Sequence, residues 1–103
     1  MADDKYSGFT NYETWVTVLW LENDEKLNRA AKDQAIGASF AFDDTPERDR
    51  YFENWMEVSL TATEGIWDSH FPVSREEKKL MKKDIGSMWR VNWKEVVDRM
   101  IAD

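Results

Sequence analysis

The 103-residue chain contains no cysteine and a single histidine, His70. Without cysteine there is no disulfide, thiolate metal site or cysteine nucleophile, and one histidine is too few for a histidine-based zinc site. The longest apolar stretch, residues 15–21, is interrupted by Thr17, and it is far shorter than the ~20 residues that span a bilayer. The N-terminal residues MADDKYSG lack the basic and then apolar order of a signal peptide. We therefore expect a cytoplasmic protein with no cofactor, metal site or membrane contact.

Aromatic and acidic residues, in contrast, are abundant. Six Trp, five Phe and three Tyr stand in a chain that is 42% apolar, which is enough to fill a small core and excludes a disordered acidic tail. The length predicts a single domain over residues 1–103, of which residues 1–9 are expected to be a flexible N-terminus. Asp and Glu number 21 against 14 Lys and Arg, for a net charge of −7.

Helix start signals near the N-terminus predict two helices. Thr10 and Glu13 have the spacing of a capping box, which predicts a helix over about 11–22. The β-branched residues at 16–18 leave a strand as the alternative in this segment. Asn23 and Asp24 predict the start of a second helix over about 24–38, whose inner face is made mostly of alanine. Its continuation to residues 43–44 is left open.

Three further start signals predict three more helices. The sequence as a whole therefore predicts an all-α, compact single-domain bundle of about five helices. Thr45-Pro46-Glu47 predicts a helix over about 46–67, and a second capping box, Ser74 to Glu77, predicts a fourth helix ending near residue 89. Asn92 predicts the start of a short terminal helix. Helical spacing assigns to the core, among others, Tyr12, Trp15, Leu19, Leu21, Leu27, Phe52, Trp55, Met56, Leu60, Thr63, Ile66, Trp67, Leu80, Met81, Ile85, Met88, Trp89, Trp93, Val96, Val97, Met100 and Ile101.

Acidic residues gather along the predicted third helix. A rotation of ~100° per residue brings five of them onto one stripe, and three more extend the charge at its N-terminal end. We call this set the acidic stripe: Asp43, Asp44, Glu47, Asp49, Glu53, Glu57, Glu64 and Asp68. Carboxylates four residues apart lie ~6 Å apart, near the ~7 Å between the phosphates of DNA. One interpretation is that the solvated stripe imitates a nucleic-acid strand and occupies the DNA-binding groove of another protein. The alternative is an ordinary solvated helix face. Arg50 interrupts the stripe.

The predicted fourth helix carries the opposite charge. Residues 1–68 hold six basic and fifteen acidic residues, whereas residues 69–103 hold eight basic and six acidic ones. The basic face comprises Arg75, Lys78, Lys79, Lys82, Lys83 and Arg90. Such a face can bind phosphates, although the nearby aromatic residue Trp89 is assigned to the core. Alternatively, the basic face pairs with the acidic helix or with a second copy in a homodimer.

Catalysis has little support in the sequence. His70 has no adjacent carboxylate pair or nucleophile, and Asp68 and Ser69 beside it have the character of helix-end residues. Glu13 and Glu53 stand in aromatic surroundings, which keeps a small enzyme as a third hypothesis. We expect no enzyme, and we expect one or two of the six tryptophans to be exposed on a partner-binding surface.

Two segments together resemble a known group of proteins. Residues 10–25 contain TNYETW, then LWL and ND, and residues 91–96 read VNWKEV. These resemble the T-N-Y-E-T-W…L-W-L…N-D signature and the V-N-W-x-E ending of small uncharacterised proteins encoded by phages and mobile elements, often near anti-restriction and anti-defence genes. The resemblance implies such an origin and no reaction. By itself the first motif is interpreted structurally, with Glu13 closing the cap and Tyr12 and Trp15 entering the core, the alternative being a binding group.

These observations lead to one main hypothesis and one alternative. The main one is a non-enzymatic, acidic phage or mobile-element accessory protein in the host cytoplasm. It binds a host protein, such as a DNA-binding or defence complex, and inhibits it by charge mimicry of nucleic acid. The alternative is a nucleic-acid-associated accessory protein that binds phosphates through the basic face; direct nucleic-acid binding is the less favoured of the two.

Overall fold

Five α-helices make up most of the described chain, and the protein is all-α. The computed structural model describes residues 6–61 and 71–102. The helices are α1 (Tyr12–Asn23), α2 (Glu25–Phe42), α3 (Pro46–Thr61), α4 (Arg75–Ile85) and α5 (Trp93–Ile101). A short 3₁₀ turn, η1 (Met88–Arg90), connects α4 to α5. The predicted five-helix bundle is therefore confirmed.

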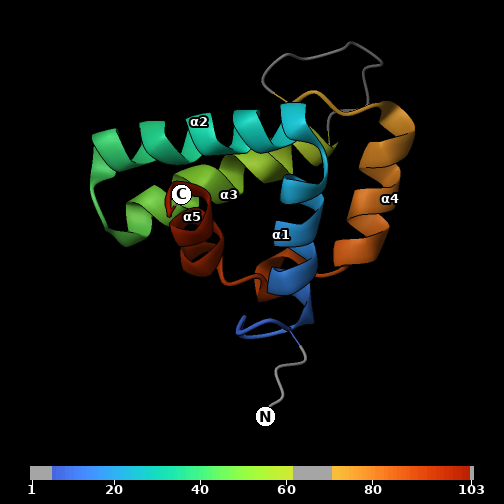
Figure 1. Cartoon of the computed structure of the whole chain (residues 1–103), viewed down its shortest axis with the longest axis horizontal. Helices are drawn as coiled ribbons and strands as arrows, with labels where there is room; N and C mark the ends of the chain where they lie inside the picture. The colour runs from blue at the N-terminus through green and yellow to red at the C-terminus, as the bar shows by residue number, and fades with distance from the viewer. Residues whose placement is uncertain (1–5, 62–70, 103) are drawn as a thin grey trace.

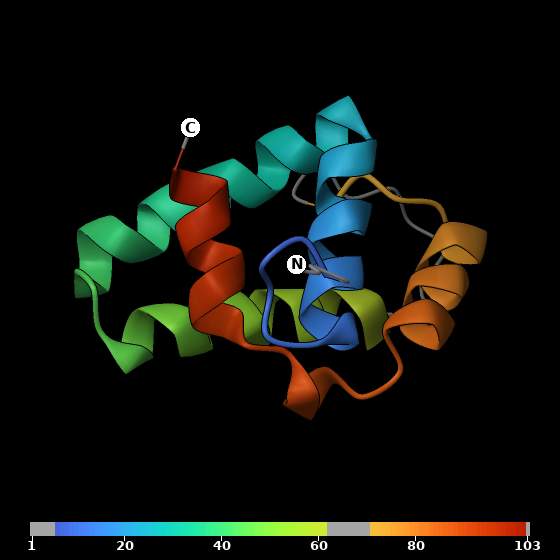
Figure 2. The same ribbon diagram turned by 60° about the horizontal axis from the view of Figure 1, so that its bottom comes forward.

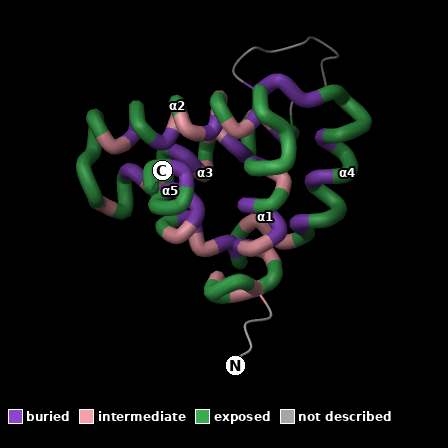
Figure 3. Tube along the Cα trace, in the orientation of Figure 1, coloured by how far each residue is buried: buried purple, intermediate pink, exposed green. Residues whose placement is uncertain are grey.

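Helix α1 occupies the middle of the bundle. It lies between α4 on one side and α5 on the other, as two views show (Figures 1 and 2), and it also contacts α2. Helices α2 and α3 contact each other, and the turn that joins them lies at the end of the molecule away from α4. The buried residues line the inner faces of these elements (Figure 3).

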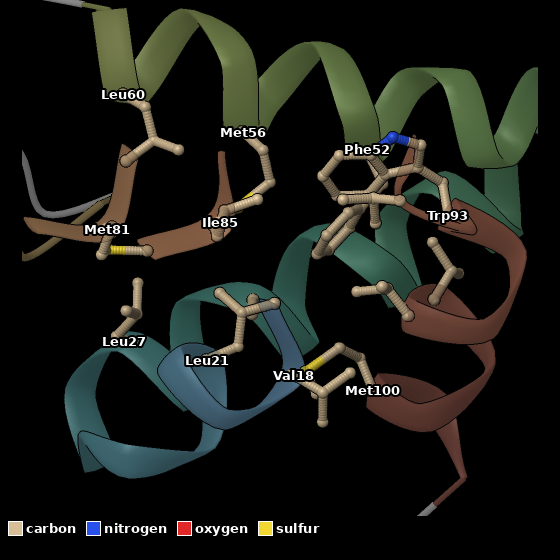
Figure 4. Close-up of a cluster of buried hydrophobic side chains, with 14 of the residues drawn as sticks. Val18, Leu21, Leu27, Phe52, Met56, Leu60, Met81, Ile85, Trp93 and Met100 are labelled. Carbon is tan, nitrogen blue, oxygen red and sulfur yellow. The ribbon is translucent and has the colours of Figure 1, made fainter. Parts of the chain in front are cut away.

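The core is formed by apolar side chains from all five helices (Figure 4). Phe52 is fully buried, with its ring centre 5.2 Å from that of Trp55 and 6.1 Å from that of Trp93. Alanines 31, 35 and 38 have no exposed surface, so the small-residue face of α2 packs closely on its neighbours as predicted. The other fully buried large side chains include Leu21, Leu27, Met56, Met81, Ile85 and Met100.

Two predicted helix boundaries differ from the structure, and one that was left open is settled. α2 continues past residue 38 and ends at Phe42. α4 ends at Ile85 because Gly86 adopts a positive φ of 75° and its N–H donates to the Lys82 carbonyl. That conformation suits glycine and stops the helix before residue 89. The N-cap of α1 is Asn11 and not Thr10: the Asn11 Oδ1 accepts from the Thr14 N–H at 2.9 Å.

Several residues assigned to the core lie at the surface instead. Leu19 is 43% exposed, Leu80 56% and Trp89 78%, and Tyr12 and Ile101 are also exposed. Helix α1 is apolar on nearly every side, so its sequence does not show which side turns outward; Trp15 and Trp20 are half-buried there. The exposure of one tryptophan is confirmed by Trp89. Thr63, Ile66 and Trp67 lie outside the described residues.

Within the described part of the chain, no helix is long and apolar enough to cross a membrane.

The two leucines of α1, one buried and one exposed, provide a direct test of this packing. Leu21 has no exposed surface, so we expect Leu21→Ala to lower the free energy of unfolding by ~2–5 kcal/mol. Leu19→Ala, two residues earlier on an exposed position, is expected to change it by less than ~0.5 kcal/mol. Urea unfolding followed by far-UV circular dichroism measures both. Equal losses from the two variants would show that α1 is oriented differently in the bundle.

Candidate functional site

The acidic stripe lies along α3 and the turn before it, but its members are not equivalent. Asp43, Asp44, Glu47 and Glu57 are exposed, whereas Asp49 and Glu53 are half-buried. Asp49, Glu53 and Glu57 follow one another at intervals of four residues on α3, as the helical spacing predicts. Glu64 and Asp68 lie outside the described residues.

A buried arginine neutralises one end of the stripe. The Arg48 side chain is 5% exposed, and its Nη2 lies 2.9 Å from Asp49 Oδ1, 2.9 Å from Asp98 Oδ1 on α5 and 3.5 Å from Asp44 Oδ1. Lys94 Nζ adds contacts of 3.1 Å to Asp98 Oδ2 and 3.4 Å to Asp44 Oδ1. The prediction that Asp49 is solvated is wrong, since a buried cation needs its carboxylates. The Arg48–Asp98 and Lys94–Asp44 contacts therefore fasten α3 and the turn before it to α5, and Asp49 helps to neutralise Arg48.

The pKa of Asp98 reflects this arrangement. Partial burial opposes its ionisation, but hydrogen bonds from Lys94 and Arg48, together with their charges, lower the pKa of the Asp98 carboxyl. The carboxylate thus stays ionised to a lower pH than an ordinary aspartate. This network is a structural connection and not an open binding surface.

The other end of the stripe is not neutralised in this way. Partial burial, a hydrogen bond with Glu57 and the charge of Glu57 raise the pKa of Glu53, and Arg50 opposes the rise only in part. No cation among the described residues comes within 4.0 Å of Glu47, Glu53 or Glu57. We call these three residues the acidic face of α3. Its like charges repel one another in the isolated protein.

Asp43 stands just before this face in an unusual backbone conformation. It is the C-cap of α2 with φ 55° and ψ −152°, and its N–H donates to the Ser39 carbonyl at 2.8 Å. Glycine adopts this region without strain, whereas a residue with a side chain does not. The chain therefore places a carboxylate at the turn at some cost in stability.

The predicted basic face is divided between two elements. Arg75, Lys79, Lys82 and Lys83 are exposed on α4. Lys78, in contrast, is buried, with its Nζ 5.8 Å from the centre of the Phe71 ring. Its place on the solvated basic face was predicted wrongly.

Arg90 does not belong to the α4 face either. It lies on η1, and its Nε is 3.4 Å from Glu13 Oε2. Its guanidinium also lies 5.7 Å from the ring centre of Trp89. Between α3 and α4, no ion pair is found in the ranges that the structure describes, so the predicted pairing of the acidic and basic helices inside one molecule is absent there.

The TNYETW and VNWKE segments bind each other. The Thr10 N–H and Oγ1 donate to the two oxygens of Glu95, at 3.0 and 2.7 Å. The Asn92 N–H donates to the Oγ1 of Thr14, a residue without exposed surface, at 2.8 Å. The Asn11 side-chain N–H donates to the Arg90 carbonyl at 2.8 Å. We call this set of contacts the terminal interlock.

The remaining polar residues near this motif also have structural roles. The Trp20 indole N–H donates to Asp84 Oδ2 at 2.9 Å and joins α1 to α4. Glu13 pairs with Arg90 and does not close the cap of α1, which corrects that prediction. Tyr12 is exposed, and only Trp15 of the two motif rings is half-buried. The geometry thus gives the motif a role in joining helices.

The cavity and the carboxylates near it give little support to a catalytic or metal site in the described chain. A cavity of about 130 Å³ lies where α1, α2 and α4 meet. Among its lining groups, Glu77 bonds to Ser74 in the capping box of α4, and Asp24 caps α2. Across the segments that are described, there is no group of three or more His, Cys, Asp or Glu residues that could hold a metal ion. The candidate His70 lies outside them.

Comparison with known proteins identifies a family. A model described as "Family of unknown function (DUF7249)" matches residues 2–86. The chain belongs to this family. No curated protein and no solved structure matches it. The DUF7249 match includes the TNYETW segment, α3 and α4, and it ends before η1 and α5, which hold the second half of the terminal interlock.

The terminal interlock can be tested at its buried hydroxyl. In Thr14→Val the Asn92 N–H loses its acceptor, and we expect the free energy of unfolding to fall by ~1–3 kcal/mol. Thr61→Val is the matched control, because among the described residues the Thr61 hydroxyl, at the exposed end of α3, donates only to backbone carbonyls of its own helix. Urea unfolding distinguishes the two. A Thr14 variant as stable as the control would remove the interlock from the contacts that hold the fold.

The raised pKa of Glu53 leads to a prediction for how the stability of the fold depends on pH. The folded-state pKa of Glu53 is raised, so its ionised form destabilises the fold at neutral pH, and this cost disappears as pH falls through that pKa. We expect Glu53→Gln to stabilise the protein at pH 7 by ~0.2–0.5 kcal/mol. The gain should vanish toward the ordinary glutamate range near pH ~4. Asp33→Asn, on an exposed position of α2, should show no such trend; a gain that persists at low pH would exclude repulsion as its cause.

Proposed function

We propose that the protein is a non-enzymatic binding protein whose acidic face engages a positively charged surface of another protein. Support comes from the net charge of −7. It also comes from Glu47, Glu53 and Glu57 on α3, which form no ion pair within the described chain. One observation carries the proposal: Glu53 and Glu57 stand one turn apart on α3, and partial burial, a hydrogen bond with Glu57 and the charge of Glu57 together raise the pKa of Glu53. A cation supplied by a partner would remove this repulsion, so complex formation gains electrostatic free energy that folding alone does not.

The mechanism is occlusion of a basic groove. Phe52, Met56 and Leu60 anchor α3 in the core, so the carboxylates on its outer side are held on a rigid support. Glutamates four residues apart lie ~6 Å apart, a spacing suited to lysines and arginines that otherwise hold successive phosphates. A protein with such a groove would bind the acidic face in place of nucleic acid.

The partner is proposed to be a host DNA-binding or defence complex. This part rests on the resemblance of the TNYETW and VNWKE segments to phage and mobile-element proteins. The site of action would then be the host cytoplasm. Family membership is compatible with this proposal but assigns no function.

A second candidate function is favoured by Trp89. This ring is 78% exposed and Arg90 lies over it, whereas the sequence had placed it in the core. Exposed aromatic rings stack with bases, and cations such as Lys79 and Lys83 attract phosphates. The alternative proposal is therefore single-stranded nucleic-acid binding by α4 and η1.

A matched pair of variants tests the main proposal. Glu53→Gln/Glu57→Gln removes two charges from the acidic face, and Glu25→Gln/Asp33→Asn removes two from the solvent side of α2. Tagged proteins are used to capture partners from host lysate, and the association rate with the main captured protein is then measured at several salt concentrations. We expect the first variant to associate roughly 10-fold more slowly at low salt and to lose most of the salt dependence. The control should behave like the wild type.

Two outcomes would contradict the main proposal. One is a Glu53→Gln/Glu57→Gln variant that captures the same partners with unchanged rates. The other is salt-dependent binding of a labelled single-stranded DNA oligonucleotide that is lost in Trp89→Ala and Lys79→Ala/Lys83→Ala, which would establish the second candidate.

A further inference from the structure

The cavity where α1, α2 and α4 meet has an apolar floor. Leu27, Val73 and Met81 line it and are each at most 7% exposed, and the side chains of Leu27 and Met81 point toward one another (Figure 4). Its volume of about 130 Å³ is close to the ~150 Å³ of an engineered apolar cavity that binds benzene. The floor therefore has room for an apolar group of about six non-hydrogen atoms.

One wall of the cavity is formed by Trp20, whose ring is already held in place. The residue is half-buried, and its indole N–H donates to Asp84 Oδ2 on α4 at 2.9 Å. This hydrogen bond fixes the ring between α1 and α4, so the wall does not need a ligand to order it. An indole ring attracts a cation that lies within ~6 Å of its centre.

Two carboxylates stand at the exposed rim of the cavity. Asp24 and Glu77 both line it, and both are exposed. Asp24 Oδ1 accepts from the N–H groups of Lys26 and Leu27 at 2.8 and 3.1 Å. Glu77 Oε1 accepts from the N–H and the hydroxyl of Ser74, both at 3.2 Å. Each carboxylate is thus fixed through one oxygen by a helix cap.

The second oxygen of each carboxylate is not used in this way. Within the ranges that the structure describes, Asp24 Oδ2 and Glu77 Oε2 accept no hydrogen bond. No lysine or arginine nitrogen there comes within 4.0 Å of either carboxylate. Two negative charges therefore stand at one rim without a counter-charge, on side chains that the caps have already ordered. Groups that are ordered beforehand bind a ligand at a lower entropic cost.

The floor, the wall and the rim together select one class of ligand. The carboxylates repel an anion, and an apolar floor does not replace the oxygen ligands that a metal ion requires. An alkylammonium group has an apolar chain with a positive charge at its end. Its chain can cover the floor while its charge lies at the acidic rim, beside the Trp20 ring.

We infer that the cavity binds an alkylammonium group of about four carbon atoms, the size that its volume allows. The group belongs either to a free small amine or to a lysine side chain of another protein, because the two share the same chemistry. The inference makes no use of the acidic face of α3, so it holds or fails separately from the proposed function.

Four small compounds test the site in the isotopically labelled full-length protein. The probe is n-butylamine; n-butanol has the chain without the charge, methylamine has the charge without the chain, and butyrate has the opposite charge. Binding is followed by two-dimensional ¹H–¹⁵N NMR. We expect n-butylamine to shift the signals of Trp20, Leu27 and Glu77, and to bind roughly 10-fold more tightly than n-butanol or methylamine. Butyrate should cause no shift.

Conservative variants remove the charge of the rim and keep the caps. Asparagine is a good N-cap and glutamine can complete a capping box, so Asp24→Asn/Glu77→Gln should leave the helix starts intact. We expect this variant to bind n-butylamine roughly 10-fold more weakly. Glu25→Gln/Glu76→Gln is the matched control, because these exposed glutamates are the next residues in sequence to Asp24 and Glu77 but do not line the cavity. Its affinity should be unchanged.

A peptide experiment distinguishes the two sources of the group. One short peptide of glycine and serine carries a central lysine, and a second carries Nε-acetyl-lysine at the same place. If the lysine peptide shifts the same signals as n-butylamine, the cavity accepts a lysine side chain of a protein. If only n-butylamine does so, the ligand is a free amine. The acetylated peptide should not bind in either case.

Four results would overturn the inference. Binding of n-butanol as tight as that of n-butylamine would make the cavity an apolar hollow without selectivity for charge. Equal losses from Asp24→Asn/Glu77→Gln and its control would mean general attraction of amines to an acidic protein. Shifts confined to α3 would place the amine on the acidic face instead, and the absence of any shift would show that the cavity takes no such ligand.

Discussion

The position of α1 depends on hydrogen bonds between residues that are far apart in the sequence. Thr10 and Glu95 are separated by 85 positions and Thr14 and Asn92 by 78, yet both pairs are bonded. The buried Thr14 hydroxyl donates to Asn11 Oδ1 and accepts from the Asn92 N–H, which without it would remain unpaired at a cost. With α1 fixed in this way, α4 and α5 have a defined surface to pack on at each side, and α3 closes the core through Phe52.

The sequence predicts those helix ends that are determined by local contacts. Ser74 and Glu77 form the expected capping box, and Asn92 caps α5 by accepting from the Glu95 N–H. The prediction for Thr10 is wrong because its hydroxyl bonds to Glu95, a partner that no local pattern reveals. Leu19 is misassigned for a related reason: α1 is apolar on almost all sides, so only the arrangement of its neighbours decides which residue is exposed.

The acidic stripe is likewise predicted correctly where it depends on local spacing and incorrectly where it depends on contacts between distant residues. Helical periodicity correctly places Asp49, Glu53 and Glu57 on neighbouring turns of α3. It does not show that Asp49 pairs with a buried Arg48, because Arg48 is also held by Asp98, fifty residues further along the chain. The contact between the Phe42 and Tyr51 rings is likewise hidden in the sequence, because the two come together only through the turn between α2 and α3.

The terminal interlock also has a consequence for biosynthesis. A ribosome adds ~5–20 residues per second, so Thr14 is made roughly 4–16 s before Asn92, 78 residues later. During that interval the nascent chain can form α1, α2 and α3 as local helices, but the polar groups at the start of α1 have no partner and Phe52 is not yet covered by Trp93. Completion of the fold therefore follows synthesis of α5, and until then the emerging chain exposes the apolar surface that chaperones recognise.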